Sequence, residues 1–174
     1  LGNQVFWVCP FIEESKKIDH SSAIKKSEYL SKLFPKEVFL LHGKTTAEEK
    51  EIILNKFLKN EFKILVSTTI IEVGIDFPNA NVIIIENANK FGLSQLHQLR
   101  GRVGRGSKDS SCILMFKSNL SDNAKKRINI LKDSNDGFKI SEEDMKLRGF
   151  GDILGFKQSG IKNFKLADPV HNHD

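Results

Sequence analysis

The amino-acid sequence predicts an α/β fold in which a parallel sheet carries helices on both faces and is followed by a helical hairpin and a glycine-rich arm. Short apolar segments of strand length alternate with segments whose apolar residues recur at helical spacing, which is typical of a parallel sheet. Beyond Phe116 the pattern changes to two helical segments. Glycines then recur at positions 149, 151, 155 and 160, and no strand is evident there.

The first part of the chain is expected to form the sheet. Its predicted strands span residues 5–9, 38–41, 64–66, 82–85 and 113–116. Pro35 ends a helix that lies between the first two strands. The residues that indicate this helix by their spacing are Ala23, Ser27, Leu30, Leu33 and Phe34.

A second helix is expected to begin after Thr46. The segment Thr46-Ala-Glu-Glu49 has the form of a capping box, and Ile52, Ile53 and Phe57 follow on the predicted apolar face. The candidate motifs described below all come just after strands. Because ligands of parallel sheets bind at the carboxyl ends of strands, we expect the functional site at that edge.

The second part of the chain is expected to be helical. Residues 121–133 form one helix, Gly137 breaks it, and a further helix runs from Ser141 to about Arg148. We therefore divide the chain into a sheet domain at 1–120, a hairpin with its arm at 121–168, and a tail at 169–174. The acidic residues 136 and 142–144 are interpreted as a cap and a solvated first helical turn rather than as catalytic acids.

Composition and charge restrict the function. No apolar run approaches the ~20 residues that span a bilayer, and no signal sequence opens the chain. Cys9 and Cys112 lie far apart in apolar stretches, which indicates buried thiols in a reducing, cytoplasmic compartment.

The basic residues are concentrated in one segment. Residues 98–132 hold nine Lys and Arg against two Asp and Glu, whereas residues 1–97 hold twelve Lys and Arg and twelve Asp and Glu. This concentration favours phosphate binding, with a solvated basic helix as the alternative.

The segment Gln98-Leu-Arg-Gly-Arg-Val-Gly-Arg105 carries the strongest functional pattern. Its glycines permit close approach of the backbone to another molecule, and arginine offers a planar charged fork that suits phosphate oxygens. Arg102 and Arg105 lie three residues apart, so on a helical turn they point the same way. The pattern Q-x-x-G-R-x-G-R resembles the sixth motif of superfamily 2 helicases. In that family the last two arginines reach the γ-phosphate of ATP across a cleft.

Two further patterns follow strands. Thr68 and Thr69 offer hydroxyls to a sugar-phosphate backbone, and Asp76, after the turn at Gly74, accepts a bond from a ribose hydroxyl or an arginine. This segment resembles the fifth helicase motif. The pair His42-Gly43 resembles the fourth-motif region, with a surface histidine in a strand-to-helix turn as the alternative.

Nucleotide and metal sites of other kinds are not indicated. Gly43-Lys-Thr45 imitates the end of a P-loop, but the glycine required five positions earlier is replaced by Val38. No acidic Walker-B-like box follows a strand. His171 and His173 have no further ligands nearby, so no metal site is predicted. The chain has the arginine half of an ATPase site and lacks the half that holds nucleotide and Mg²⁺.

The surroundings of these motifs resemble the RecG family of branched-DNA translocases. The similar segments are 8–15, 85–88 and 91–98, followed by 135–138, 145–149 and 155–160, which resemble the translocation motif shared with the transcription-repair coupling factor Mfd. The resemblance implies a second RecA-like motor domain with a translocation hairpin. The first RecA-like domain of the full-length chain, holding ATP and Mg²⁺, is then the expected partner, together with branched DNA.

The resemblance also implies residue roles. Gln98, Arg102 and Arg105 match the catalytic motif, and Gly74 and Asp76 join the two arginines in ATP binding. His42, Gly43, Thr68 and Thr69 match DNA-binding positions. Arg127, Arg148 and Gln158 match positions that couple ATP hydrolysis to movement. Phe150 departs from the family, which commonly has proline there.

Three functions remain open from the sequence. The first is the C-terminal motor half of an ATP-dependent DNA helicase that remodels replication forks and Holliday junctions. The second is a nucleic-acid-binding module without enzymatic activity that uses the basic segment 98–132. The third is an Mfd-like motor that acts on stalled RNA polymerase. The fragment alone is expected to be inactive as an ATPase.

Overall fold

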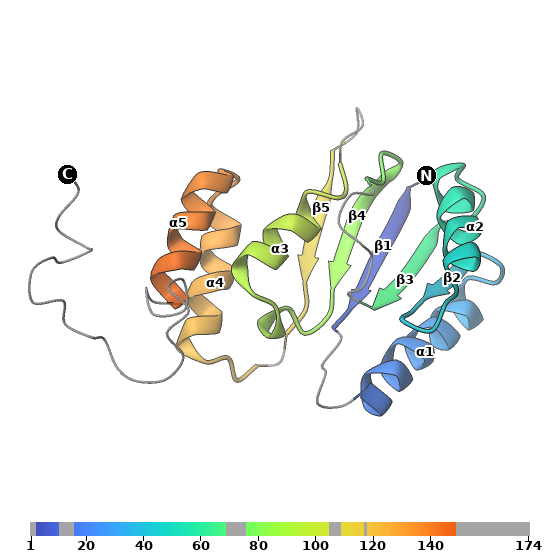
Figure 1. The fold of residues 1–174 in the computed structure, drawn as a ribbon, viewed down its shortest axis with the longest axis horizontal. Helices are drawn as coiled ribbons and strands as arrows, with labels where there is room; N and C mark the ends of the chain where they lie inside the picture. The colour runs from blue at the N-terminus through green and yellow to red at the C-terminus, as the bar shows by residue number, and fades with distance from the viewer. Residues whose placement is uncertain (1–2, 11–15, 69–75, 105–108, 117, 149–174) are drawn as a thin grey trace, which may run out of the picture.

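The chain folds around a parallel sheet of five strands in the order β2-β3-β1-β4-β5 (Figure 1). The computed structural model describes residues 3–10, 16–68, 76–104, 109–116 and 118–148. The strands are β1 (Gln4–Cys9), β2 (Val38–Leu41), β3 (Ile64–Thr68), β4 (Ala80–Ile85) and β5 (Ser111–Leu114). The helices are α1 (Lys16–Leu33), α2 (Ala47–Leu58), η2 (Ala88–Lys90), α3 (Leu93–Arg100), α4 (Asp122–Asp133) and α5 (Gly137–Arg148). The predicted fold class is confirmed.

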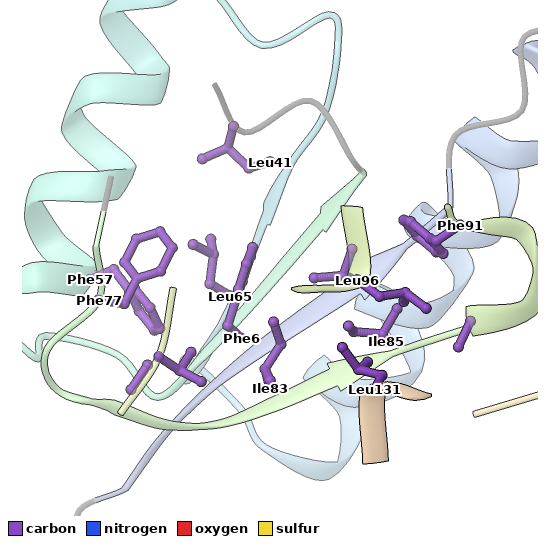
Figure 2. Packing of buried hydrophobic residues seen from close by; sticks show 14 of the residues in the cluster. Phe6, Leu41, Phe57, Leu65, Phe77, Ile83, Ile85, Phe91, Leu96 and Leu131 are labelled. Carbon is purple, nitrogen blue, oxygen red and sulfur yellow. The ribbon is translucent and has the colours of Figure 1, made fainter. Parts of the chain in front are cut away.

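The larger core lies on the sheet face that α2 and α3 cover. Figure 2 shows its aromatic part, where the Phe6 and Phe77 ring centroids lie 5.1 Å apart and those of Phe57 and Phe77 lie 5.3 Å apart. Aromatic rings at such separations and tilts attract each other, and this attraction adds to the stabilisation that comes from burying their surface. The core continues past α3, because Leu131 of α4 and Ile140 of α5 belong to the same cluster. The hairpin and the sheet therefore share one core.

The opposite face carries α1 and a smaller cluster. Ala23 and Leu30 pack there against Cys9, Ile64 and Val66. Ser27 is also buried, as its helical spacing predicted, but Leu33 and Phe34 are about half exposed, so that part of the predicted apolar face is wrong. Phe34 lies beyond the last helical residue, where the chain turns towards β2.

A polar cluster ties α1 to the sheet. Glu86, just after β4, accepts a hydrogen bond from Trp7 Nε1 at 3.1 Å and forms an ion pair with Lys26 at 2.8 Å. The Lys26 ammonium also lies 5.0 Å from the centroid of the Trp7 ring, within cation–π range. Burial, together with the nearby Glu86 carboxylate, raises the pKa of Cys9 to about 12. This thiol is buried as expected and stays protonated; Cys112 is partly buried.

The second helix begins as the sequence predicts. The Thr46 hydroxyl accepts from Glu49 N at 3.2 Å, and the Glu49 carboxylate accepts from Thr46 N at 3.1 Å, which completes the capping box. The apolar face is displaced from the prediction, since Ile52 is 55% exposed whereas Leu54 and Phe57 are buried. Among the described residues, no helix is long and apolar enough to cross a membrane.

The strands β1, β3 and β4 extend one or two residues beyond the predicted ranges. Further differences concern β5, α3 and α5. The fifth strand spans Ser111–Leu114 rather than 113–116, because its pairing with β4 ends where Ile85 meets Leu114. The helix α3 was not predicted; it begins at Leu93, before the arginine motif, and ends inside it at Arg100. Gly137 begins α5 instead of breaking a helix, and Asp136 caps it by accepting from Phe138 N at 2.9 Å.

Candidate nucleotide-facing and nucleic-acid-facing site

The arginine motif is divided between a helix and a loop. Residues up to Arg100 lie in α3, and Gly101 N closes the helix on the His97 carbonyl at 3.0 Å. We call residues 101–104 the arginine loop. Gly104 has a φ of +76°, and a Cβ there would lie 2.2 Å from the Ser110 hydroxyl oxygen, so only glycine fits.

The arginine loop is fixed to the start of β4. Phe77 N donates to the Arg102 carbonyl at 2.9 Å, and Gly104 N donates to the Ala80 carbonyl at 3.0 Å. Phe77 and Val103 form a parallel bridge, and both side chains are buried. These bonds hold the loop at the amino end of the strand, independently of any ligand.

The loop brings together two residues that the sequence predicted for nucleotide binding. Arg102 Nη1 lies 3.5 Å from Asp76 Oδ1, and the two side chains are 21% and 35% exposed. Of the two partners foreseen for Asp76, a ribose hydroxyl or an arginine, the structure shows the arginine. Gln98 lies in the last turn of α3 with its side chain exposed. The Arg102 guanidinium keeps donors that Asp76 does not occupy, since it carries five N–H groups.

The nucleic-acid candidates lie at the other edge of the sheet. His42 and Gly43 follow the carboxyl end of β2, and Thr68 is the last residue of β3. The expectation that all motifs meet at the carboxyl edge is therefore wrong for Asp76 and Arg102. The chain crosses from one edge to the other between Thr68 and Ala80, because β3 and β4 are parallel and both pair with β1.

His42 has a local role in the structure, and Thr68 is buried. His42 Nδ1 accepts from Lys44 N at 3.2 Å, which shapes the turn before α2. Beside it, a hollow of about 510 Å³ is lined by His42, Gly43, Lys50 and Asn55 among others. Thr68 is only 2% exposed, and its hydroxyl oxygen has no hydrogen-bond partner among the described residues. In this conformation Thr68 does not face solvent.

The side chains of the basic segment 98–132 differ in exposure and in partners. Arg127 Nη1 donates to the Phe91 carbonyl at 3.1 Å and Nη2 to the Asn89 carbonyl at 3.3 Å, so its guanidinium joins α4 to η2 and the residue that follows it. Lys126 and Lys132 are exposed. The charge count favoured phosphate binding by this segment, but two donors of Arg127 are bonded to backbone carbonyls inside the molecule.

Sequence reasoning assigned no role to Arg100. Its Nη1 donates to the carbonyls of Leu131 at 2.7 Å and Ser134 at 2.9 Å, and its Nη2 lies 2.9 Å from His97 Nδ1. A guanidinium can only donate, so His97 Nδ1 accepts and its proton sits on Nε2. Burial, with a smaller effect from Arg100, lowers the pKa of His97. The signal in the sequence was the i, i+3 spacing of these two residues at a helix end.

A second contact also joins α3 to the hairpin. The Ser94 hydroxyl donates to Asp144 of α5, and Asp144 is only 6% exposed. The interpretation of residues 142–144 as a solvated turn is therefore wrong for Asp144. Glu142 and Glu143 pair with Lys146 at the surface, but they lie in the middle of α5 rather than in its first turn.

Some predicted residues lie outside the described part of the chain. They are Thr69, Gly74, Arg105, Phe150 and Gln158. Arg148 ends α5, but its side chain is not among those described. The glycine-rich arm and the tail also lie outside. Their predicted roles stay predictions.

Comparison with known proteins identifies the family. The description "Helicase conserved C-terminal domain" matches residues 1–107, and "ATP-dependent DNA helicase RecG, domain 3, C-terminal" matches residues 134–172. The chain belongs to the helicase C-terminal domain family. Within superfamily 2 it is RecG-like, as the resemblance implied.

Proteins named RecG align with nearly all of this chain. ATP-dependent DNA helicase RecG of Bacillus subtilis (strain 168) is 49% identical over 174 residues, which cover 99% of this chain and 25% of that protein. RecG of Synechocystis sp. is 50% identical over 175 residues, covering 99% of this chain and 21% of that protein. The chain thus spans about a quarter or less of the length of these relatives.

A solved structure supports the same assignment. The structure described as RecG bound to a three-way DNA junction is 46% identical with a TM-score of 0.72, and the match covers 87% of this chain and 20% of that chain. The sheet described above is therefore a RecA-like α/β fold.

Proposed function

We propose that this chain is the C-terminal motor half of an ATP-dependent DNA helicase that remodels branched DNA such as replication forks and Holliday junctions. The observation that carries the proposal is the partly exposed Arg102, paired with Asp76 in a loop fixed to the start of β4. Identity of 49% to a RecG protein over the whole chain supports it. No observation favours the coupling motor that acts on RNA polymerase or a binding module without activity.

The described residues fit the phosphate end of ATP and not its metal. Arg102 offers a charged fork to phosphate oxygens, and Asp76 orients that fork. Mg²⁺ prefers oxygen ligands, which a guanidinium cannot supply. In the proposed enzyme ATP and Mg²⁺ are therefore held mainly by the first RecA-like domain of the full-length chain. Arg102 and, with it, Arg105 contact the γ-phosphate from across the cleft and stabilise its developing charge.

The remaining site residues have proposed roles on the DNA side. Hydroxyls of Thr68 and Thr69 and the turn at His42-Gly43 contact the sugar-phosphate backbone at the carboxyl edge. Because Thr68 is buried here, its contact requires the neighbouring segment to rearrange when DNA binds. Arg148 and Gln158 join Arg127 in coupling hydrolysis to movement.

Arg102→Ala in the full-length protein tests the proposal. We expect DNA-stimulated kcat to fall by ~10³-fold or more, the scale of arginine contributions to phosphoryl transfer in GTPases, with branched-DNA affinity largely retained. Arg102→Lys should not restore kcat, because lysine lacks the planar fork. Lys132→Ala, which removes an exposed charge of the hairpin, serves as control. Near-normal kcat in Arg102→Ala would show that this guanidinium is a surface charge only.

A further inference from the structure

Arg100 connects the last turn of the motif helix to the end of another helix. The last four carbonyls of a helix have no partner within it. Arg100 binds one such carbonyl, that of Leu131, and the carbonyl of Ser134, which follows the end of α4. A cation placed there also interacts favourably with the helix dipole. One side chain of α3 thus holds the end of α4.

His97 completes this arrangement from the same turn. Its Nδ1 accepts from Arg100, and its other ring nitrogen lies against Gly137, where an added Cβ would be 3.2 Å from Nε2. The imidazole therefore sits between the Arg100 guanidinium and the first residue of α5. Both ends of the α4–α5 turn are in this way held by residues of α3.

The arginine loop begins at the next residue. Gly101 follows Arg100 directly, and Arg102 N bonds back to the Leu99 carbonyl at 3.1 Å. Because the loop has the start of β4 on one side and α3 on the other, a shift of the last turn of α3 displaces Arg102 relative to Asp76. The hairpin is therefore placed to determine where the Arg102 guanidinium lies.

We propose that Arg100, assisted by His97, is a positioning residue that sets the arginine loop against the α4–α5 turn. This inference rests on the proposed function of Arg102 in hydrolysis and adds a residue to it. Arg100 itself touches no phosphate in this arrangement, because its fork is used by Leu131, Ser134 and His97.

The test compares Arg100→Ala, Arg100→Lys and the control Lys132→Ala in the full-length protein. We expect Arg100→Ala to lower the kcat of DNA-stimulated ATP hydrolysis by about tenfold or more, while KM for ATP and affinity for a three-way junction change by less than about threefold. Arg100→Lys should recover only a minor part, since one ammonium cannot reach three acceptors in a plane. Lys132→Ala should match the unaltered protein.

Hydrogen exchange separates this inference from the proposed function. In Arg100→Ala, the amides of Gly101, Arg102 and Gly104 should exchange at least about tenfold faster, whereas those of β1 and β3 should not change. This result does not depend on ATPase activity. Unchanged exchange in the loop, or kcat within twofold of the unaltered protein, would overturn the positioning role. Absence of DNA-stimulated ATPase in the unaltered full-length protein would overturn the proposed function alone.

Discussion

Exposure separates two neighbouring residues of α5. Ile140 is 1% exposed and belongs to the shared core, whereas Phe138 is 91% exposed. We expect Ile140→Ala to lower the free energy of unfolding by about 2–5 kcal/mol and Phe138→Ala to change it by less than about 0.5 kcal/mol. Urea unfolding of the 174-residue chain measures both. A large loss for Phe138→Ala would mean that this ring packs against the molecule.

The imidazole of His97 gives the stability a dependence on pH. Burial, then Arg100, lowers its pKa from the usual 6.5, so the unfolded chain binds this proton at a higher pH than the folded chain does. Neutral His97 therefore contributes to the free energy of unfolding above pH 6.5, and this contribution is lost as the pH falls below that value.

His97→Gln isolates that contribution, because the amide oxygen can still accept from Arg100 but does not titrate. Unfolding free energies are compared at several pH values between about 5 and 8, using the usual range of histidine titration. We expect the difference between the two proteins to change in favour of His97→Gln as the pH falls. An identical pH profile for both would contradict the lowered pKa of His97.

At the scale of elements, the start of α2 depends on its capping box. We expect Thr46→Ala to lower the free energy of unfolding by about 1 kcal/mol, because two backbone donors lose their side-chain partners or their geometry. Glu51→Gln, an exposed change one turn further along, should have a much smaller effect. Thermal unfolding followed by circular dichroism compares the two; equal effects would show that the cap adds nothing.

The helix α4 offers a test of coupling against simple phosphate binding. Because Arg127 is bonded to the carbonyls of Phe91 and Asn89, we expect Arg127→Ala to leave the salt dependence of DNA affinity unchanged and to raise the ATP consumed per base pair unwound. Loss of a phosphate contact would instead lower the salt slope by about one unit.

The exposed neighbour Lys126 supplies the matched control for Arg127. Lys126→Ala removes the same charge from the same helix without touching the carbonyls. If Arg127→Ala lowers affinity and ATPase together at an unchanged distance moved per ATP, Arg127 is an electrostatic contact and its coupling role is wrong.

Local signals predicted most elements and missed those that depend on tertiary pairing. The capping box and the strands of the sheet interior follow from the sequence alone. The limits of β5 do not, because the apolar run 113–116 continues past the point where β4 stops pairing, and Phe116 is left exposed. The spacing of Leu93, Leu96 and Leu99 was a helical signal, and it was overlooked beside the motif residues.

The sequence predicted which kinds of residue pair with each other more reliably than it predicted where each side chain lies. The partnership of Asp76 with an arginine follows from charge, and the structure shows it. The use of Arg100 and Arg127 inside the molecule could not be read from the sequence, because it depends on which backbone carbonyls two separate helices present. A cluster of basic residues gives the net charge and not the direction of each side chain.

For the whole molecule, we expect the 174-residue chain to hydrolyse no ATP by itself. It supplies arginines, and neither a P-loop nor a Walker-B-like box appears in its sequence. Steady-state hydrolysis with and without branched DNA measures this. The control is the full-length protein with its P-loop lysine replaced. DNA-stimulated turnover by the pure chain well above that control would show that the chain binds nucleotide productively.

Because the two edges of the sheet lie far apart, a small rotation at one edge produces a large displacement at the other. β4 has six residues, so at a rise of about 3.3 Å per residue the proposed nucleotide-facing edge and the proposed DNA-facing edge lie about 20 Å apart. A rigid rotation of about 10° around the arginine loop sweeps the far edge through an arc of about 3.5 Å, close to the axial rise of ~3.4 Å per base pair in DNA. In the proposed enzyme, a small change of angle at the γ-phosphate would thus suffice for a step of one base pair.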